Sequence, residues 1–330
     1  MKKLLTLCLT GLLSANALAD HESDHTLTVY TYDSFVSDWG PGPKIKEAFE
    51  KNCHCVLNFV AEEDGVSILN RLKIEGKKVK ADVILGLDQA LINEAKATGL
   101  IAEHQQDLSN LEGALNWKDS AFVPYDFGYF AFIYDSTKIK QPVTSLKALV
   151  ESDATVIYQD PRTSTPGQGL MFWMNAVYQD QTKAAWKQLA SHTQTVTKGW
   201  YEGYSMFLKG GSDYVLSYTT SPAYHMIAES ETKYKAAQFS EGHVAQIEVA
   251  AALNTSKQAE LAQQFLGFLV SDEAQKILPV TNWMLPVVKS VELPAQFDEL
   301  IKPQAIELNI DQISKQRKPW IVDWRSSAIK

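Results

Sequence analysis

The stretch Leu27–Pro43, LTVYTYDSFVSDWGPGP, contains a strand, a loop and the approach to a helix. The alternating β-branched and aromatic residues of Leu27–Tyr32 predict the strand. The run GPGP then interrupts the chain ahead of an apolar-periodic helix that begins near Lys44. A strand that ends in an aromatic loop at a helix start places flat side chains where α/β sheets collect ligands. Many folds begin in this way, so the constraint comes from the repetition of the pattern.

Short strands and amphipathic helices alternate after this opening. Helical periodicity separates further predicted strands at Val56–Val60, Ala81–Leu85, Thr155–Gln159 and Asp213–Tyr218. This alternation predicts βαβ units and mainly parallel sheets. Two longer runs, Phe122–Tyr134 and Val244–Leu253, have the character of strands that cross between domains. We predict an α/β fold of two lobes, each a mainly parallel sheet flanked by helices, joined by two crossing segments.

The length of 330 residues exceeds what one hydrophobic core usually organises, so two domains are expected. The crossing strands set their boundaries. Residues 20–124 and 251–330 form the predicted first lobe, and residues 125–250 form the second. A ligand cleft then lies between the lobes. The tail up to Trp324 is predicted to pack back on the first lobe.

The first nineteen residues have the pattern of a secretory signal peptide. Lys2 and Lys3 precede the apolar run Leu4–Leu13, and Ala17-Leu18-Ala19 matches a cleavage signal. We predict cleavage after Ala19 and export to the periplasm. Because no later run reaches the ~18 apolar residues of a membrane span, the mature protein is predicted not to span a membrane.

The charge of the chain is acidic. The sequence holds 31 Lys and Arg against 39 Asp and Glu, and the predicted signal contains two of the lysines and no acid. The mature chain therefore carries a net charge of −10. An acidic surface argues against nucleic acid or an anionic membrane as a partner.

Only two cysteines, Cys53 and Cys55, remain in the mature chain. In an oxidising compartment they can form a disulfide, although one intervening residue makes a strained ring. Two free thiols are the alternative. A metal site needs more ligands than this segment offers, and we predict none.

Two loops precede helices in the manner of anion sites. Asp64-Gly65-Val66-Ser67 presents backbone N–H groups, and Gly65 permits close approach of a ligand. The loop 162–167, RTSTPG, adds three hydroxyls. Unpaired N–H groups and the helix dipole favour phosphate or carboxylate at such ends. The alternative is that Asp64 and Ser164 or Thr165 only cap their own helices.

Several aromatic residues fall at strand ends or in loops. They are Tyr32, Trp39, Trp200, Tyr218, Tyr224 and Trp283. Each alone is more typical of a core or a rim, but together they favour a stacking site for a flat ring that can carry positive charge. No P-loop, G-x-S-x-G or H-E-x-x-H motif occurs, so the sequence does not predict an enzyme.

Nine motifs are distributed in order along essentially the whole mature chain. They are TVYTYDSF (28–35), DWGPGP (38–43), EDGVS (63–67), ADVILGLD (81–88), DFGYFAF (126–132), VIYQDPRTSTPG (156–167), TVTKGW (195–200), LSYTTSPAYH (216–225) and NWMLP (282–286). In these motifs the chain resembles the periplasmic thiamine-binding proteins of bacterial ABC transporters. The resemblance implies a type II periplasmic binding protein that closes over its ligand by hinge bending.

The resemblance also implies a ligand, partners and a site. The ligands are thiamine, thiamine monophosphate and thiamine diphosphate, which are cargo rather than cofactors. The partners are an inner-membrane ABC permease and its ATPase. The residues implied for the phosphate end are Asp64, Gly65, Ser164, Trp200 and Tyr218, with Trp39 nearby. Those implied for ring stacking are Tyr32, Tyr224 and Trp283.

Two other functions are weighed against this one. A ferric-iron-binding protein of the same fold needs two or more tyrosine oxygens at one point, and the six-residue separation of Tyr218 and Tyr224 argues against it. A periplasmic phosphatase acting on thiamine phosphates needs a nucleophile or a metal set, and the sequence offers neither.

Overall fold

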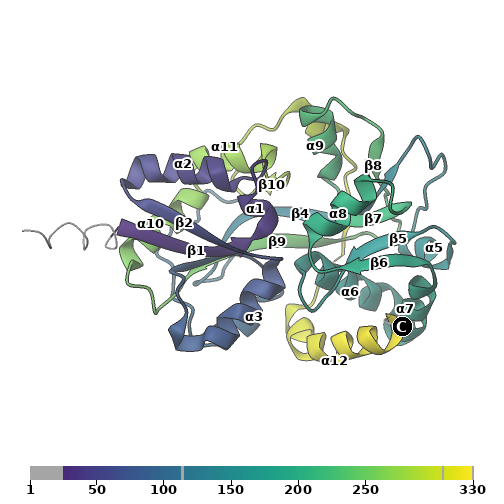
Figure 1. Cartoon of the computed structure of the whole chain (residues 1–330), viewed down its shortest axis with the longest axis horizontal. Helices are drawn as coiled ribbons and strands as arrows, with labels where there is room; N and C mark the ends of the chain where they lie inside the picture. Colours follow the sequence, from purple (N-terminus) through teal and green to yellow (C-terminus); the bar gives the residue numbers. More distant parts are fainter. Residues whose placement is uncertain (1–24, 113–114, 307, 329–330) are drawn as a thin grey trace, which may run out of the picture.

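The computed structural model describes residues 25–112, 115–306 and 308–328. The predicted signal peptide and its cleavage site lie outside these residues. Figure 1 shows two lobes side by side, with β1, α2 and α10 in one and β5, β6 and α7 in the other. Two strands, β4 and β9, run between the lobes.

The strands that build the sheet are mostly short. They are β1 (Thr26–Tyr32), β2 (Val56–Glu62), β3 (Val83–Asp88), β4 (Val123–Asp135), β5 (Val156–Gln159), β6 (Thr193–Thr197), β7 (Tyr214–Tyr218), β8 (Tyr234–Ala236), β9 (His243–Ala252), β10 (Leu285–Pro286) and β11 (Ala305–Ile306).

The helices cover both faces of the sheet and carry its connections. They are α1 (Asp33–Val36), α2 (Gly42–Cys53), α3 (Gly65–Glu75), α4 (Ile92–Lys96), α5 (Leu146–Glu151), α6 (Thr165–Tyr178), α7 (Thr182–His192), α8 (Trp200–Leu208), α9 (Ser221–Ala228), α10 (Ala259–Leu269), α11 (Asp272–Ile277) and α12 (Ile310–Ala328).

The main path of the sheet has the order β2-β1-β3-β9-β4-β7-β5-β6. At one end β1 pairs in parallel with β2 and β3, and at the other β5 pairs in parallel with β6 and β7. The first half of β4 pairs antiparallel with β9, and its second half pairs with β7. The predicted α/β fold is confirmed; pairing is parallel among the outer strands of each lobe, and antiparallel where β4 and β9 join them. The two predicted crossing segments correspond to β4 and β9.

Each lobe has its own hydrophobic core. The first is built around β1 and β3, whose apolar residues are almost fully buried, and includes Phe35, Phe122 and Phe265. The second is built on β4, β5, β7 and α6, and includes Phe132, Trp173 and Trp186. Strands buried on both faces are expected to be continuous apolar runs, as VILGL of β3 is.

The C-terminal helix α12 corrects one part of the predicted domain boundaries. The sequence assigned residues 251–330 to the first lobe. Residues up to Val288 do belong to the first core, but Ile313 and Trp324 of α12 are buried in the second. Figure 1 shows α12 beneath the second lobe, next to α7. A helix with one apolar stripe can cover either lobe, so its sequence alone does not choose between them.

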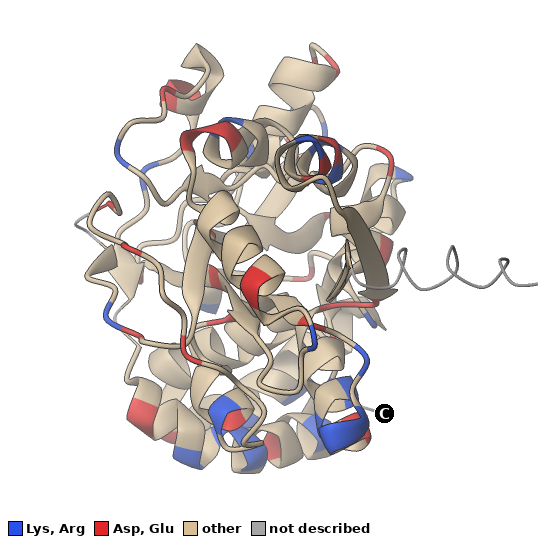
Figure 2. Ribbon diagram, turned by 90° about the vertical axis from the view of Figure 1, so that its left-hand side faces the viewer, with Lys and Arg blue, Asp and Glu red and all other residues tan. Residues whose placement is uncertain are grey.

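Three further features concern the cysteines, the membrane and the surface charge. Cys53, the last residue of α2, forms a disulfide with Cys55, which selects between the disulfide and free-thiol alternatives. None of the helices in the described part of the chain has the length and apolar content of a membrane span. Figure 2 shows acidic and basic positions interspersed over the described helices rather than a single basic face.

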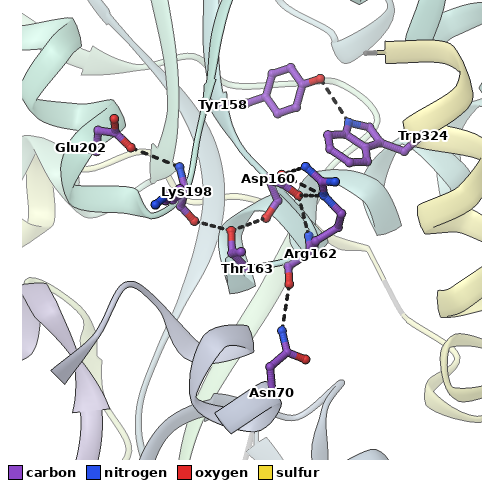
Figure 3. Close-up of polar contacts among 8 residues, drawn as sticks. All are labelled: Asn70, Tyr158, Asp160, Arg162, Thr163, Lys198, Glu202 and Trp324. Atoms are coloured by element: carbon purple, nitrogen blue, oxygen red, sulfur yellow. Dashed lines mark hydrogen bonds and ion pairs between the residues drawn. The ribbon is translucent and has the colours of Figure 1, made fainter. Parts of the chain in front are cut away.

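The packing of α12 generates a stability prediction. Trp324 is fully buried, and its Nε1 donates to the Tyr158 hydroxyl at 3.2 Å (Figure 3). We expect Trp324→Ala to lower the free energy of unfolding by about 3–5 kcal/mol, because it leaves a large cavity. Denaturant unfolding measures this change. The exposed Val322 on the same helix is the control, and Val322→Ala should change it by less than about 0.5 kcal/mol. Equal effects of the two substitutions would contradict this packing.

Candidate ligand-binding site

A cavity of about 270 Å³ lies between the two lobes. The first lobe contributes the end of β1, α1 and the start of α3, and the second contributes the starts of α6 and α8, the end of β7, and α9. Its walls consist of Tyr32, Asp33, Ser34, Trp39, Glu63, Asp64, Thr165, Pro166, Trp200, Tyr201, Tyr204, Ser205, Leu208, Tyr218, Ser221, Tyr224, Glu248, Asn282, Trp283 and Met284. Ligand sites in open α/β sheets form at such carboxyl ends of strands.

The structure brings seven of the nine predicted site residues together on this wall. They are Asp64, Trp200, Tyr218, Trp39, Tyr32, Tyr224 and Trp283. Gly65 and Ser164 are not on the wall, although each is directly bonded to Asp64 through a hydrogen bond. Ser164 is fully buried, and its hydroxyl donates to the Asp64 carboxylate instead of facing the cavity.

Asp64 connects the two lobes at one end of the cavity. Within its own lobe it is the N-cap of α3 and accepts from Gly65 N at 2.7 Å. From the other lobe it accepts from Ser164 Oγ at 2.8 Å, Thr165 N and Oγ1 at 3.1 Å, and Trp200 N at 3.2 Å. The carboxylate therefore lies at the starts of α3, α6 and α8, where backbone N–H groups favour a negative charge. Burial nevertheless raises the pKa of Asp64, against these donors.

A polar loop of the second lobe rests on α3 beside this carboxylate. Asn70 Nδ2 donates to the Arg162 carbonyl at 3.2 Å, and Ser67 N donates to the Thr163 carbonyl at 3.1 Å. The Thr163 hydroxyl in turn donates to the Lys198 carbonyl at 2.6 Å (Figure 3). The backbone at Gly199 lies close to Glu63 of the first lobe. Only glycine fits there, because a Cβ at this position would lie 2.6 Å from the Glu63 carbonyl oxygen. The lobes are closed on each other along this edge.

Aromatic rings from both lobes meet beside Asp64. Trp39 of the first lobe lies 6.3 Å from Trp200 and 5.5 Å from Tyr201, measured between ring centroids. Trp200 stacks on Tyr204 at 5.0 Å, and its Nε1 donates to Ser217 Oγ at 2.7 Å. These contacts fix the Trp200 ring on the second lobe and leave Trp39 as the partner that moves with the first lobe.

A second aromatic pair lines another part of the wall. Tyr224 and Trp283 make an edge-to-face contact with centroids 5.4 Å apart. The Tyr224 hydroxyl donates to Glu229 at 2.9 Å, and the other Glu229 oxygen lies 2.7 Å from His225 Nδ1. Trp283 has a φ of 59°, a left-handed conformation that is costly for a bulky residue and is often found at ligand sites. Its indole nitrogen has no hydrogen-bond partner in the described part of the chain.

Three carboxyl groups lie in register across the strands behind the cavity. Glu248 of β9 is opposite Asp126 of β4 and Asp88 of β3. Glu248 faces the cavity and accepts from the hydroxyls of Tyr32 at 2.8 Å and Tyr125 at 2.7 Å. Burial raises the pKa of all three groups, and raises that of Asp88 to about 7.

The chain was compared with known proteins. The family description "Bacterial extracellular solute-binding protein" matches residues 41–276. The chain belongs to this family. It is 57% identical over 304 residues to the thiamine-binding periplasmic protein of Escherichia coli strain K12, covering 91% of this chain and 92% of the relative. The resemblance indicated by the motifs is thereby confirmed.

Solved structures agree with this assignment. A structure described as a periplasmic thiamin binding protein superposes with a TM-score of 0.91 at 52% identity, covering 97% of this chain and all of that one. A ferric binding protein from Campylobacter jejuni superposes with a TM-score of 0.77 at 17% identity, over 92% of this chain and all of that one. The second likeness shows the fold alone. The family consists of solute-binding proteins, which confirms the prediction of a binding protein rather than an enzyme.

Sequence reasoning missed several residues of the wall, chiefly Asp33, Tyr204, Glu248 and Asn282. Asn282 stands inside the NWMLP motif, one position before the predicted Trp283. Glu248 could have been found as the one charged residue within the apolar strand HVAQIEVAAA. A lone acid at a position that its neighbours mark as buried indicates a paired or functional group.

The pKa of Asp88 generates a prediction of pH dependence. Burial raises this pKa from 3.8 to about 7, so the unfolded chain releases the proton first as pH rises. The stabilising contribution of the protonated group is complete below about pH 4 and is lost as pH rises through about 7. Asp88→Asn cannot ionise. We expect it to stabilise the protein relative to wild type by on the order of 2–4 kcal/mol at pH 8 and by little near pH 4.

Paired unfolding titrations of wild type and variant at several pH values measure this difference. Asp153→Asn, at an exposed position, is the matched control and should give the same small difference at every pH. If the difference in unfolding free energy between Asp88→Asn and wild type were also the same at every pH, the Asp88 carboxyl would ionise at the same pH in the folded and unfolded states. That result would contradict the prediction.

Proposed function

We propose that this protein is the periplasmic solute-binding subunit of an ABC importer that captures thiamine, thiamine monophosphate and thiamine diphosphate. The observation that carries the proposal is one interlobe cavity in which aromatic rings and converging helix starts face the same space. The 57% identity to a protein named for thiamine binding supports the same ligand.

The aromatic walls suit the two heterocycles of thiamine. One ring is a permanently charged thiazolium and the other an aminopyrimidine, and both are flat. Electron-rich faces of Tyr and Trp attract a cationic ring by roughly 0.5–2 kcal/mol per contact. We assign the rings to the space among Tyr32, Tyr224 and Trp283, of which the last two already make an edge-to-face pair.

The phosphate end is assigned to the starts of α6 and α8. Ser164 Oγ, Thr165 N and Trp200 N all donate to Asp64 in this closed arrangement. A phosphorylated tail can use these donors only if it displaces the Asp64 carboxylate or meets it protonated. Thiamine has no such tail and leaves the contacts of Asp64 intact. Gly65, Tyr218 and Trp39 complete the assigned phosphate end.

Delivery follows from the architecture. Hinge bending at β4 and β9 opens and closes the cavity, and a membrane permease with its cytoplasmic ATPase receives the ligand from the closed lobes. Export to the periplasm with cleavage after Ala19 completes the proposal, in line with relatives that are named periplasmic proteins.

Ring stacking is tested at Tyr224 and Trp283. We expect Tyr224→Ala and Trp283→Ala each to weaken binding of all three thiamine forms by about 3–30-fold, because each removes one ring contact. Isothermal titration calorimetry measures the dissociation constants. Trp320→Ala, on α12 and away from the cavity wall, is the control and should bind as wild type does.

Spermidine and ferric ion should be titrated in the same way. A separate assay should measure phosphate release from thiamine diphosphate. Tight binding of ferric ion without thiamine would favour the iron-binding alternative. Release of inorganic phosphate would favour the phosphatase. Neither result is expected from the proposed function.

The phosphate end is tested at Ser164. We expect Ser164→Ala to weaken thiamine diphosphate by about tenfold and thiamine by less than about threefold, because only the phosphate takes a charge-assisted hydrogen bond from this hydroxyl. Ser145 is the N-cap of α5, where its Oγ accepts from Ala148 N at 2.9 Å. Ser145→Ala controls for the loss of a helix cap and should change neither affinity. Equal weakening of both ligands by Ser164→Ala would contradict the assignment.

A further inference from the structure

The cavity wall carries acidic residues and no basic ones. Four of the residues that line it are Asp33, Glu63, Asp64 and Glu248, and none of the described lining residues is Lys, Arg or His. In a space enclosed by protein, unbalanced charges of one sign attract a ligand of the other sign. The wall as a whole therefore favours a ligand that carries a positive charge.

Three of these acids are balanced by other groups or by solvent. Asp64 accepts hydrogen bonds at the starts of three helices. Glu63 is nearly half exposed and lies 3.9 Å from the Lys198 ammonium. Asp33 is only partly buried, so solvent screens its charge, and burial and the neighbouring Asp64 raise its pKa to about 6.

Glu248 differs from these three. It is 6% exposed, and the four side chains that donate to it are all neutral. Tyr32 and Tyr125 donate through their hydroxyls at 2.8 and 2.7 Å, Gln246 Nε2 at 3.0 Å and Asn282 Nδ2 at 3.3 Å. Four donors stabilise a carboxylate on Glu248, yet no Lys, Arg or His of the described residues forms an ion pair with it.

The carboxyl opposite Glu248 does not compete for this charge. Asp126 is fully buried and receives one side-chain hydrogen bond, from Asn282 Nδ2 at 2.6 Å, while its Oδ1 has no partner in the described part of the chain. Burial and the charge of Glu248 raise the pKa of Asp126 well above its usual value. Of the two groups, Glu248 accepts more hydrogen bonds that stabilise a negative charge, and it is the one that faces the cavity.

We propose that the Glu248 carboxylate is the counter-ion of the cationic ring of the ligand and makes the cavity selective for charged over neutral heteroaromatic ligands. The proposal rests on the proposed function, because it takes the thiazolium as that cation. Tyr32 and Asn282 connect the carboxylate to the aromatic walls, since both donate to it and both line the cavity. Stacking alone would bind a neutral ring of the same shape equally well. A buried anion favours the charged ring over the neutral one.

The test compares thiamine with 3-deazathiamine, a neutral isostere in which a thiophene replaces the thiazolium. We expect the wild type to bind thiamine at least about tenfold more tightly than the isostere. A close charge pair in a desolvated site contributes more binding free energy than a tenfold change in the dissociation constant requires. In Glu248→Gln, which keeps the shape of the side chain, thiamine should lose about tenfold or more and the neutral isostere less than about threefold. Titration calorimetry gives both constants.

Two matched variants separate charge from structure. Glu248→Asp keeps the charge and should keep the preference for thiamine, although both ligands bind more weakly. Glu47→Gln removes an exposed acid that does not line the cavity and should leave the preference unchanged. Equal losses of both ligands in Glu248→Gln would mean that Glu248 only maintains the shape of the site, and this would overturn the proposal.

The wild-type comparison decides the matter even if Glu248→Gln does not fold. A wild type that binds the neutral isostere as tightly as thiamine has no charge selectivity, which overturns the proposal and leaves the proposed function intact. A wild type that binds neither ligand overturns the proposed function itself.

Discussion

The structure depends on two strands that belong to both lobes. The pairing of β4 passes from β9 to β7 within one continuous strand, so the lobes share backbone hydrogen bonds while keeping separate cores. The chain passes between the lobes a third time between Val288 of the first core and Ile313 of the second, so β4 and β9 are two of the three connections that any motion of the lobes would involve. Glu248 of β9, which faces the cavity, lies where the two lobes meet.

The contacts of Asp64 join closure of the lobes to anion recognition. Its carboxylate lies where three helices begin and accepts donors from both lobes, so the groups that hold the lobes together are those that could bind an anionic tail. The sequence presents an anion site and a helix cap as alternatives for this loop. In the structure Asp64 is the cap of α3 and also accepts donors from the other lobe. The cap orients the carboxylate, and the orientation allows the contact between lobes.

The sequence predicts what is repeated along the chain and misses what depends on packing between distant segments. Strand and helix alternation indicated the fold, and aromatic residues after strands indicated the cavity wall. The packing of α12 on the second lobe depends on contacts with segments distant in sequence, which no local pattern encodes. The left-handed conformation of Trp283 has no signal in the local sequence, and the neutral partners of Glu248 come from segments far apart in sequence.

A protein with an acidic surface can accept a ligand with an anionic tail. The local field of the cavity, and not the net charge of the protein, determines which ligand charges are favoured there. One end offers helix starts that favour negative charge, and the floor offers the Glu248 carboxylate, which favours positive charge. A molecule with a cationic ring and an anionic tail has the complementary order of charges. When the tail is missing, Asp64 supplies the negative group that the helix starts require. On the proposed function, this substitution lets one cavity hold thiamine and its phosphates without a basic side chain among the described residues of its wall.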